Sequence, residues 1–328
     1  MQGLVELGLA NAVMATLLAA IVAVVCRVYR QPALVHSLWL LVLLKLLVPP
    51  LLWLGIIYLG SLLALLAHSF FRLDDYTAQV VYEPTLSTYA ELLSSQANLF
   101  IILRSVLMAT TVTLISAIIG FPLAYYMARY TSTRTKAFFY IAVMLPLWSN
   151  YLVRVYSWKV ILAKEGVITW LFNMVGAGPV LDSVLDLPVI GGPSLSVSYI
   201  GTCIVFIYIW LPYMILPIEA AMERVPRSLI EASADLGAKP QETFRKVILP
   251  LAIPGVAAGS IFTFSLTLGD FIIPGVIGSS RPFIGQVVYA QQGTAGNLPL
   301  AAAFAVVPIV VMGVYLAIAK RFGAFDAL

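Results

Sequence analysis

The sequence predicts an all-α integral membrane protein, with six membrane-spanning helices and one or two further hydrophobic segments at the N-terminus. Of its 328 residues, 61% are hydrophobic and 10% are charged, and the mean hydropathy is +0.98. Soluble domains are about 45–50% apolar and about 25% charged. The hydrophobic residues also come in continuous runs, and a helix needs about 20 such residues to cross about 30 Å of hydrocarbon.

Six runs of this length follow one another along the chain. They are solidly apolar, which favours helices over the alternating strands of a membrane barrel. They cover residues 51–71, 104–127, 137–158, 198–218, 251–273 and 299–319.

Two apolar segments precede these six runs. The first covers about residues 7–26, and we expect no cleavable signal peptide there, because no positive n-region or clear cleavage site accompanies it. The second, Leu34–Val48, is short, carries Lys45 and ends at Pro49–Pro50. A span, an interfacial helix and the lower half of a long broken helix all remain open for it, so the side of the N-terminus also remains open.

The lysine and arginine residues predict the orientation, because these residues favour the cytoplasmic side. Ten of them lie in the loop 128–136, the loop 219–250 and the tail after residue 319. The other side has Arg72, Lys159, Lys164 and Arg281, with Arg104 at a boundary. The sequence therefore predicts a cytoplasmic C-terminus and a cytoplasmic loop 219–250.

Two segments on the opposite side have a character of their own. Residues 72–103 are polar, and a short helix lying along the membrane is predicted at Leu86–Leu93. Residues 159–197 form a long segment rich in glycine and proline. Long ordered loops often serve contacts or gating, but a plain connection is equally compatible with this composition.

The loop 219–250 is a polar segment, with ten charged residues, in an otherwise apolar chain. Ser228-Leu-Ile-Glu231 has the spacing of a capping box, and Gly237 is placed to end the helix that it starts. Pro240 suits the first turn of a second helix, and Pro250 is expected to end it. Two short helices with a glycine joint could dock a cytoplasmic partner or form a solvated amphipathic loop.

A resemblance to a known family favours docking. Glu231-Ala-Ser-Ala-Asp-Leu-Gly237, followed after nine residues by Val247-Ile-Leu-Pro250, resembles the EAA loop of binding-protein-dependent ABC importer permeases. Every spacing of that pattern is present. Ser233 replaces an alanine and Val247 an isoleucine, and both changes are small.

The resemblance covers residues 51–328 and is strongest to the spermidine/putrescine permeases of the PotB type. Leu145–Tyr156, Thr85–Tyr89 and Leu268-Gly-Asp-Phe271 resemble segments of those permeases. The fold so implied is the six-helix type I ABC importer permease core. Residues 1–50 lie outside the likeness as a hydrophobic extension.

The resemblance implies a non-catalytic membrane subunit of the bacterial cytoplasmic (inner) membrane. It implies a cytoplasmic ABC ATPase dimer, a second homologous permease, an extracytoplasmic solute-binding protein and membrane lipid as partners, and no nucleic acid. No GxxxxGK[ST] motif occurs in the sequence, so ATP and Mg²⁺ are expected on the ATPase and no cofactor on this chain. The residues implied for ATPase coupling are Glu231, Ala232, Ser233, Asp235, Leu236, Gly237, Leu249 and Pro250.

Polar and aromatic residues near the outer ends of two spans are candidates for the translocation pathway, because such residues are costly inside a membrane. They are Trp148, Asn150, Tyr151, Arg154 and Asp270. A carboxylate at Asp270 could meet a cationic amine, or it could face water at a helix end. Snorkelling or structural pairing is the alternative for Arg154, and interfacial anchoring is the alternative for the aromatic residues.

Two other classes of function compete with an importer permease. A self-sufficient ion-coupled secondary transporter should have carboxylates inside its spans, and Asp270 is almost the sole candidate in these runs. A membrane enzyme should have a metal motif or a nucleophile with a base. The sequence has two cysteines, two isolated histidines and no H-E-x-x-H, so no metal site and no catalytic residue is predicted.

Overall fold

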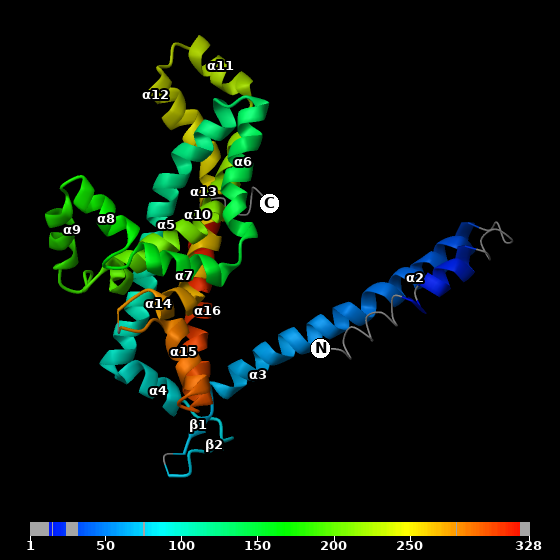
Figure 1. The fold of residues 1–328 in the computed structure, drawn as a ribbon. Coiled ribbons are helices and arrows are strands. Elements are labelled where there is room, and N and C mark those ends of the chain that lie inside the picture. Colours follow the sequence, from blue (N-terminus) through cyan, green and yellow to red (C-terminus); the bar gives the residue numbers. More distant parts are fainter. Residues whose placement is uncertain (1–12, 15, 24–31, 75, 280, 322–328) are drawn as a thin grey trace. The chain divides into compact units, whose positions relative to one another are not determined.

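A computed structural model describes residues 13–14, 16–23, 32–74, 76–279 and 281–321 (Figure 1). The regular structure of these residues is helical, as the apolar runs predict, apart from one antiparallel pair of two-residue strands. Those strands are β1 (Arg72–Leu73) and β2 (Val80–Val81). The chain divides into two compact units, Met1–Ala67 and His68–Leu328.

One helical segment dominates the first unit. α2 (Pro32–Trp53) continues into a π-helical turn, η1 (Leu54–Leu59), and then into α3 (Gly60–His68). The stretch of this helix that is apolar and long enough to span a membrane is Leu38–His68. Of the three alternatives for Leu34–Val48, the structure has the lower part of one long helix, which continues without a break through Pro49 and Pro50.

Half of the predicted run at 7–26 lies outside the described residues. Its described positions, 13–14 and 16–23, are helical.

The second unit holds the remaining helices. In chain order they are α4 (Ser87–Ser94), α5 (Gln96–Arg129), α6 (Thr133–Trp148), α7 (Tyr151–Ile161), α8 (Val167–Met174), α9 (Gly178–Leu185), the 3₁₀ turn η2 (Leu195–Val197), α10 (Tyr199–Glu223), α11 (Arg227–Asp235), α12 (Pro240–Thr243), the π turn η3 (Phe244–Ile248), α13 (Leu249–Gly269), α14 (Ile272–Val276), α15 (Ile284–Gly293) and α16 (Leu298–Arg321).

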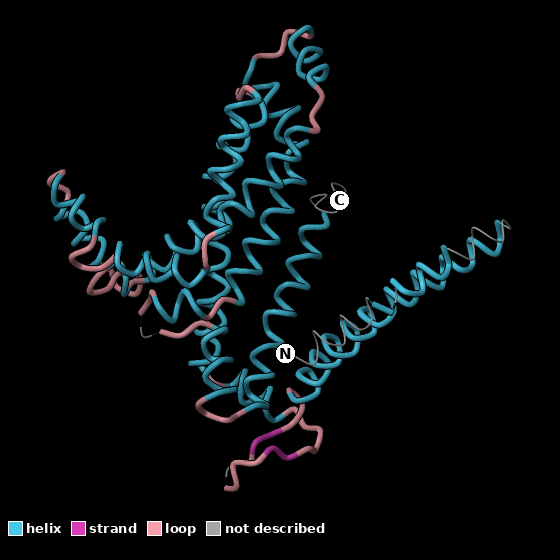
Figure 2. Tube along the Cα trace, turned by 45° about the vertical axis from the view of Figure 1, so that its right-hand side comes forward, coloured by secondary structure: helices cyan, strands magenta, loops and turns pink. Residues whose placement is uncertain are grey.

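The core of this unit is the bundle of α5, α10 and α13, with α16 beside it (Figure 2). Met214, Ile218 and Met222 of α10 are fully buried between the other two helices. Gly255 on α13 lets the backbones approach, because an added Cβ would lie 2.5 Å from Ala221 Cβ on α10. Small residues at helix contacts are typical of membrane bundles, where close packing replaces the hydrophobic effect between helices.

Four predicted spans of this unit are single helices that are apolar and long enough to cross a membrane. They correspond to α5, α10, Pro240–Gly269 and α16. The expectation that Pro250 ends a separate loop helix is wrong, since Pro240–Gly269 is continuous. The π turn η3 directly precedes Leu249 and Pro250, and its wider spacing accommodates the missing proline N–H.

The predicted span at 137–158 is not one straight helix. α6 and α7 meet at a bend of 95° across Ser149 and Asn150. The Asn150 side chain accepts hydrogen bonds from the N–H groups of Leu152 (2.9 Å) and Val153 (3.4 Å), so it caps a new helix there. With this pair counted as one span, the described residues contain up to six spans.

The two outer segments also contain short elements. The predicted helix at Leu86–Leu93 is confirmed as α4, whereas the strands β1 and β2 were not predicted. The glycine- and proline-rich segment folds into the helices α8 and α9.

Candidate functional site

Six of the eight predicted coupling residues lie on a helical hairpin formed by α11 and α12, and the other two, Leu249 and Pro250, begin α13. Gly237 joins the two helices with a φ of +80°, which confirms the predicted left-handed joint. The N–H of Ala238 donates to Ser233 O at 3.1 Å, and that of Gly237 to Ala234 O at 2.8 Å. This pattern is a Schellman motif, in which glycine at C′ avoids the Cβ strain of a positive φ.

The predicted capping box at Ser228 and Glu231 is wrong. α11 begins at Arg227, two residues earlier than predicted, and Pro226 occupies the N-cap position without a side-chain hydrogen bond. Ser228 is therefore already inside the first turn. A side chain does reach back at the start of α12, where Lys239 N–H donates to Glu242 Oε2 at 3.2 Å.

The hairpin exposes most of the residues in its EAA-like segment. Leu236 is 88% exposed, and Glu231, Ala232, Asp235 and Gly237 are also exposed. Ser233 instead faces α12, where its hydroxyl is 2.9 Å from that of the buried Thr243. An exposed leucine of this degree, held on an ordered hairpin, gives the loop an apolar contact point.

A depression lies beside the hairpin. It has a volume of about 500 Å³ and a largely apolar lining. Leu249 is half-buried in its wall, while Pro250 is exposed just beyond it. The lining residues are Pro240, Gln241, Phe244, Arg245 and Leu249.

The root of the hairpin holds a buried ionic cluster that the sequence analysis missed. Glu219 of α10 is 1% exposed, and Lys136 Nζ of α6 lies 3.0 Å from its Oε1. Tyr140 donates its hydroxyl hydrogen to Glu219 Oε2, and Lys136 also pairs with Glu223. Nearby, Arg129 Nη2 donates to the carbonyls of Met222 and Val225, both at 2.9 Å.

This cluster ties three helices together where α10 leads into α11. The missed signal was the pair of i,i+4 spacings, Glu219/Glu223 on one helix and Lys136/Tyr140 on another, each of which places two side chains on one face. The sequence analysis places Glu219 at the start of the loop 219–250 and therefore expects almost no buried carboxylate other than Asp270. That expectation is wrong, because Glu219 is buried at the end of α10.

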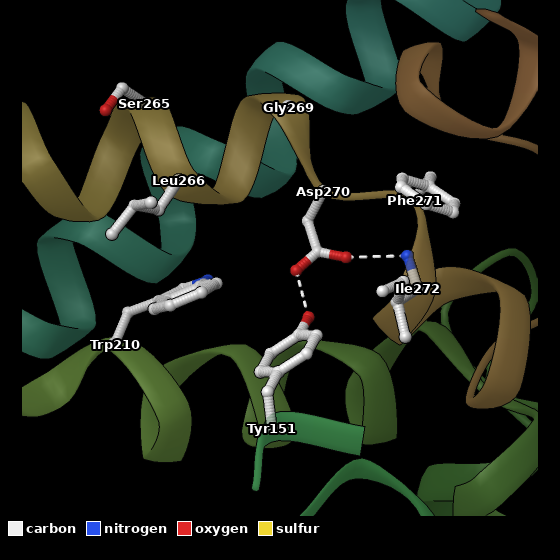
Figure 3. Close-up of a pocket in the computed structure, with 8 residues that line it drawn as sticks. All are labelled: Tyr151, Trp210, Ser265, Leu266, Gly269, Asp270, Phe271 and Ile272. Atoms are coloured by element: carbon white, nitrogen blue, oxygen red, sulfur yellow. Dashed lines mark hydrogen bonds between the residues drawn. The ribbon is translucent and has the colours of Figure 1, made fainter. Parts of the chain in front are cut away.

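The outer candidates meet where α13 ends. Asp270 follows Gly269 directly, and its Oδ1 accepts hydrogen bonds from the N–H groups of Ile272 (2.7 Å) and Ile273 (3.0 Å). Its Oδ2 accepts a hydrogen bond from the Tyr151 hydroxyl (Figure 3). Asp270 therefore ends one helix, caps the next and reaches across to α7.

A pocket of about 390 Å³ opens beside this carboxylate (Figure 3). The Trp210 ring stacks on Tyr151, with ring centres 5.9 Å apart and planes 19° apart. Among the described residues, Asp270 forms no salt bridge and the buried Trp210 Nε1 has no hydrogen-bond partner. The pocket thus combines an anion without a counter-ion and two stacked aromatic rings.

The other three outer candidates take different positions. Arg154 lies with its guanidinium carbon 5.9 Å from the Tyr151 ring centre, and its Nε and Nη1 are buried without a hydrogen-bond partner among the described residues. Asn150 has its Oδ1 engaged in capping α7. Trp148, at the end of α6, is 73% exposed and is not among the residues lining the pocket.

Comparison with known protein families identifies one matching family. Its model describes a binding-protein-dependent transport system inner membrane component and matches residues 117–323. That range contains both the hairpin and the outer pocket.

Two relatives cover most of the chain. The chain is 58% identical over 286 residues to the inner membrane ABC transporter permease protein YdcU of Escherichia coli (strain K12), covering 87% of this chain and 91% of that protein. It is 29% identical over 271 residues to the spermidine/putrescine transport system permease protein PotB of Salmonella typhimurium (strain SL1344), covering 82% and 89%.

A solved structure shares the fold. A chain of a bacterial ABC transporter involved in the import of the acidic polysaccharide alginate superposes with a TM-score of 0.63 at 17% identity, covering 88% of this chain and 97% of that one. This likeness supports an all-helical fold shared with that chain.

Proposed function

This chain belongs to the family of binding-protein-dependent transport system inner membrane components, and on that premise we propose that its cargo is a small organic cation, with the polyamines spermidine and putrescine as first candidates. The chain is thus a multi-pass ABC importer permease subunit. The observation that carries the cargo proposal is Asp270, a carboxylate without a counter-ion beside a pocket of about 390 Å³.

The chemistry of this pocket suits an ammonium group. A carboxylate and the faces of Tyr151 and Trp210 attract a cation by charge and by cation–π interaction. Trp148, Asn150 and Arg154 then border the path rather than bind the cargo. Likeness to a permease named for spermidine and putrescine points to the same class, at 29% identity.

ATP hydrolysis belongs to other subunits in this proposal. A cytoplasmic ATPase dimer binds ATP and Mg²⁺, since the chain has no phosphate-binding motif. A second permease of similar fold completes the membrane pathway, and an extracytoplasmic binding protein delivers the cargo. The loop 219–250 and the C-terminus then face the cytoplasm.

The hairpin is the proposed contact with the ATPase. Leu236 and the exposed edge formed by Glu231, Ala232 and Asp235 form the apolar and charged parts of the contact, and Gly237 sets the angle between α11 and α12. Leu249 and Pro250 are the first residues of α13, which follows the hairpin, and Asp270 comes directly after the last residue of α13. ATP then shifts the equilibrium between inward-facing and outward-facing states by binding one of them more tightly.

The test is hydrolysis by the assembled transporter. The chain is reconstituted with its second permease, ATPase and binding protein, and ATPase activity is measured with spermidine, putrescine, glutamate and glycerol. The proposal expects stimulation by the two amines alone. Stimulation by glutamate or glycerol instead would discard the cationic cargo, and amine uptake that proceeds without the ATPase would favour an ion-coupled secondary transporter.

A matched pair of glycine variants tests the hairpin in the same assay. Gly237→Val places a β-branched residue at a φ of +80°, and Gly296→Val does so at +68° between α15 and α16; neither added Cβ meets another atom within 4 Å. Both carry similar local strain, because such a φ is a genuine outlier for a β-branched residue. Only Gly237→Val should abolish amine-stimulated hydrolysis; equal losses in both would remove the coupling role of the hairpin.

A further inference from the structure

The segment that follows α7 carries an exposed apolar surface. We call residues 162–190 the outer arm; it comprises α8, α9 and their connections. No charged residue lies between Glu165 and Asp182. Trp170, Met174 and Val180 are 61%, 71% and 60% exposed. An arm surrounded by water would leave this apolar surface hydrated.

The outer arm is ordered because its core is continuous with that of the bundle. Leu162 and Leu181 are buried, and Phe172 packs against the same cluster, which also contains Met108 of α5 and Phe206 of α10. The arm is also fastened at its base, where Ser196 N–H donates to Leu162 O at 3.0 Å and Tyr199 N–H donates to Ile190 O at 3.1 Å. The exposed apolar residues therefore form a defined outer face, not an unpacked core.

The depth of the arm follows from helix lengths. α6 has 16 residues and rises about 24 Å, at about 1.5 Å per residue, before the bend of 95° into α7. α13 has 21 residues and rises about 32 Å before Asp270, which contacts Tyr151 at the start of α7. The hydrocarbon layer is about 30 Å thick, which the rise of α13 matches and that of α6 approaches, so the start of α7 lies near its outer edge.

The arm continues from α7 and extends away from the bundle of α5, α10 and α13, with its tip turned towards the end that carries α11 and α12 (Figure 1, Figure 2). The exposed side of α7 is also apolar, with Val153, Tyr156 and Val160 all more than half exposed. The apolar face of α7 and that of the arm thus form one surface at the membrane boundary, where tryptophan and tyrosine are enriched.

From this placement we propose that the outer arm lies in the outer-leaflet interface, with Trp170, Met174 and Val180 inserted among lipid acyl chains. The partner is lipid and not a protein, because the arm projects sideways from the bundle within the depth that α13 spans, and its exposed charged residues lie towards its two ends in the sequence, at Lys164, Glu165, Asp182 and Asp186. Apolar burial drives the insertion, as in other interfacial helices. Because the arm follows directly after Ile161, its insertion then fixes the position of α7 relative to the membrane, and with it that of Tyr151 at the start of α7. This proposal rests on membrane insertion alone and is independent of the cargo.

The test locates a fluorophore on the arm. In a background with Cys26→Ser and Cys203→Ala, Met174→Cys is labelled with the environment-sensitive dye NBD, and the full chain is reconstituted with its partner subunits in phosphatidylethanolamine/phosphatidylglycerol vesicles. Tyr76→Cys, at the 99% exposed position on the turn between β1 and β2, is the aqueous control, and NBD-labelled lipid calibrates depth. Quenching by lipid spin-labelled at acyl carbon 5 is compared with quenching by aqueous iodide.

The proposal expects the Met174→Cys label to be quenched several-fold more by the spin-labelled lipid, and several-fold less by iodide, than the Tyr76→Cys label. Iodide quenching equal to that of the control would place the arm in water and overturn the proposal. Protection from both quenchers would show a protein partner and would also overturn it. A Ser183→Cys label, on an exposed polar position of α9, should be reached by iodide more than the Met174→Cys label.

Discussion

Two carboxylates at opposite ends of the bundle each accept a hydrogen bond from a tyrosine, and they differ in what else they meet. Glu219 receives the hydroxyl of Tyr140 and the charge of Lys136, and it is 1% exposed. Asp270 receives the hydroxyl of Tyr151 and two backbone N–H groups, is partly exposed to a pocket, and has no salt bridge among the described residues. A tyrosine–carboxylate pair can thus be a closed structural joint or an open site, and the counter-ion distinguishes the two.

The most disruptive way to test this difference is to remove the counter-ion at the closed end. Lys136→Met leaves the buried Glu219 charge unpaired, which should cost about 3 kcal/mol of stability, because an uncompensated buried charge is strongly unfavourable. The thermal midpoint of the purified chain in detergent measures the loss. The double variant Lys136→Met/Glu219→Gln removes both charges and should recover most of it; no recovery would mean that Lys136 acts through packing.

Neutralising the carboxylate at the open end, Asp270, should leave the fold intact. Asp270→Asn keeps a carbonyl oxygen for the N–H groups of Ile272 and Ile273 and a polar group for Tyr151, so its stability should change by less than about 1 kcal/mol. Asp270→Ala loses these contacts and should destabilise by about 1–3 kcal/mol. A thermal midpoint for Asp270→Asn as low as that of Asp270→Ala would show that the charge itself is structural.

The same chemical change, removal of a tyrosine hydroxyl, can be made at both ends of the bundle. Tyr151→Phe and Tyr140→Phe each delete one hydroxyl donor, worth about 1.5–3 kcal/mol when the acceptor is charged. The loss should be smaller for Tyr140→Phe, because Lys136 still neutralises Glu219. Added spermidine should raise the thermal midpoint of Tyr140→Phe, whose outer pocket is intact, by more than that of Tyr151→Phe, which lacks the hydroxyl that contacts Asp270. An equal response of both variants would remove the distinction between the two ends.

The smallest expected effect concerns Asp74, a carboxylate outside the bundle, which serves as the reference for the pH dependence of stability. Asp74 accepts N–H hydrogen bonds from Thr77 and Tyr76, each at 2.9 Å, and these bonds lower its pKa below the usual 3.8. The stabilisation of this turn is therefore fully present above that ordinary pKa and is lost as the pH falls through the lowered value. Hydrogen exchange of the Tyr76 and Thr77 amides should be insensitive to Asp74 titration between pH 5 and pH 8, apart from the intrinsic rate; protection that changes within this range would contradict the assignment.

The number of apolar helices and the glycine joint followed from the sequence because both depend on local signals. A run of about 20 apolar residues is a direct measure of a span, and Gly237 followed by Pro240 is a local stop and start. The match of residues 117–323 to a permease family agrees with the resemblance that the loop suggested. The assignment of coupling and pathway roles to particular residues stays a prediction.

What the sequence did not predict depends on contacts between distant segments. The bend at Asn150 falls inside an apolar run, and it forms because a side chain caps a helix that meets Asp270, 120 positions further along. The continuous helix through Pro250 depends on a π turn, which has no clear sequence signature. Glu219 was assigned to a loop, because its burial depends on Lys136 and Tyr140 of another helix.

The central claim is that Asp270, and not Glu219, meets a cationic cargo. Its most direct test is the number of spermidine molecules imported per ATP hydrolysed by the reconstituted transporter, at saturating loaded binding protein. For Asp270→Asn this ratio should fall about tenfold or more, since losing one charged contact costs about 1.5 kcal/mol or more. Glu223→Gln, which removes an exposed charge at the closed end, should leave it unchanged. An unchanged ratio for Asp270→Asn would contradict the account.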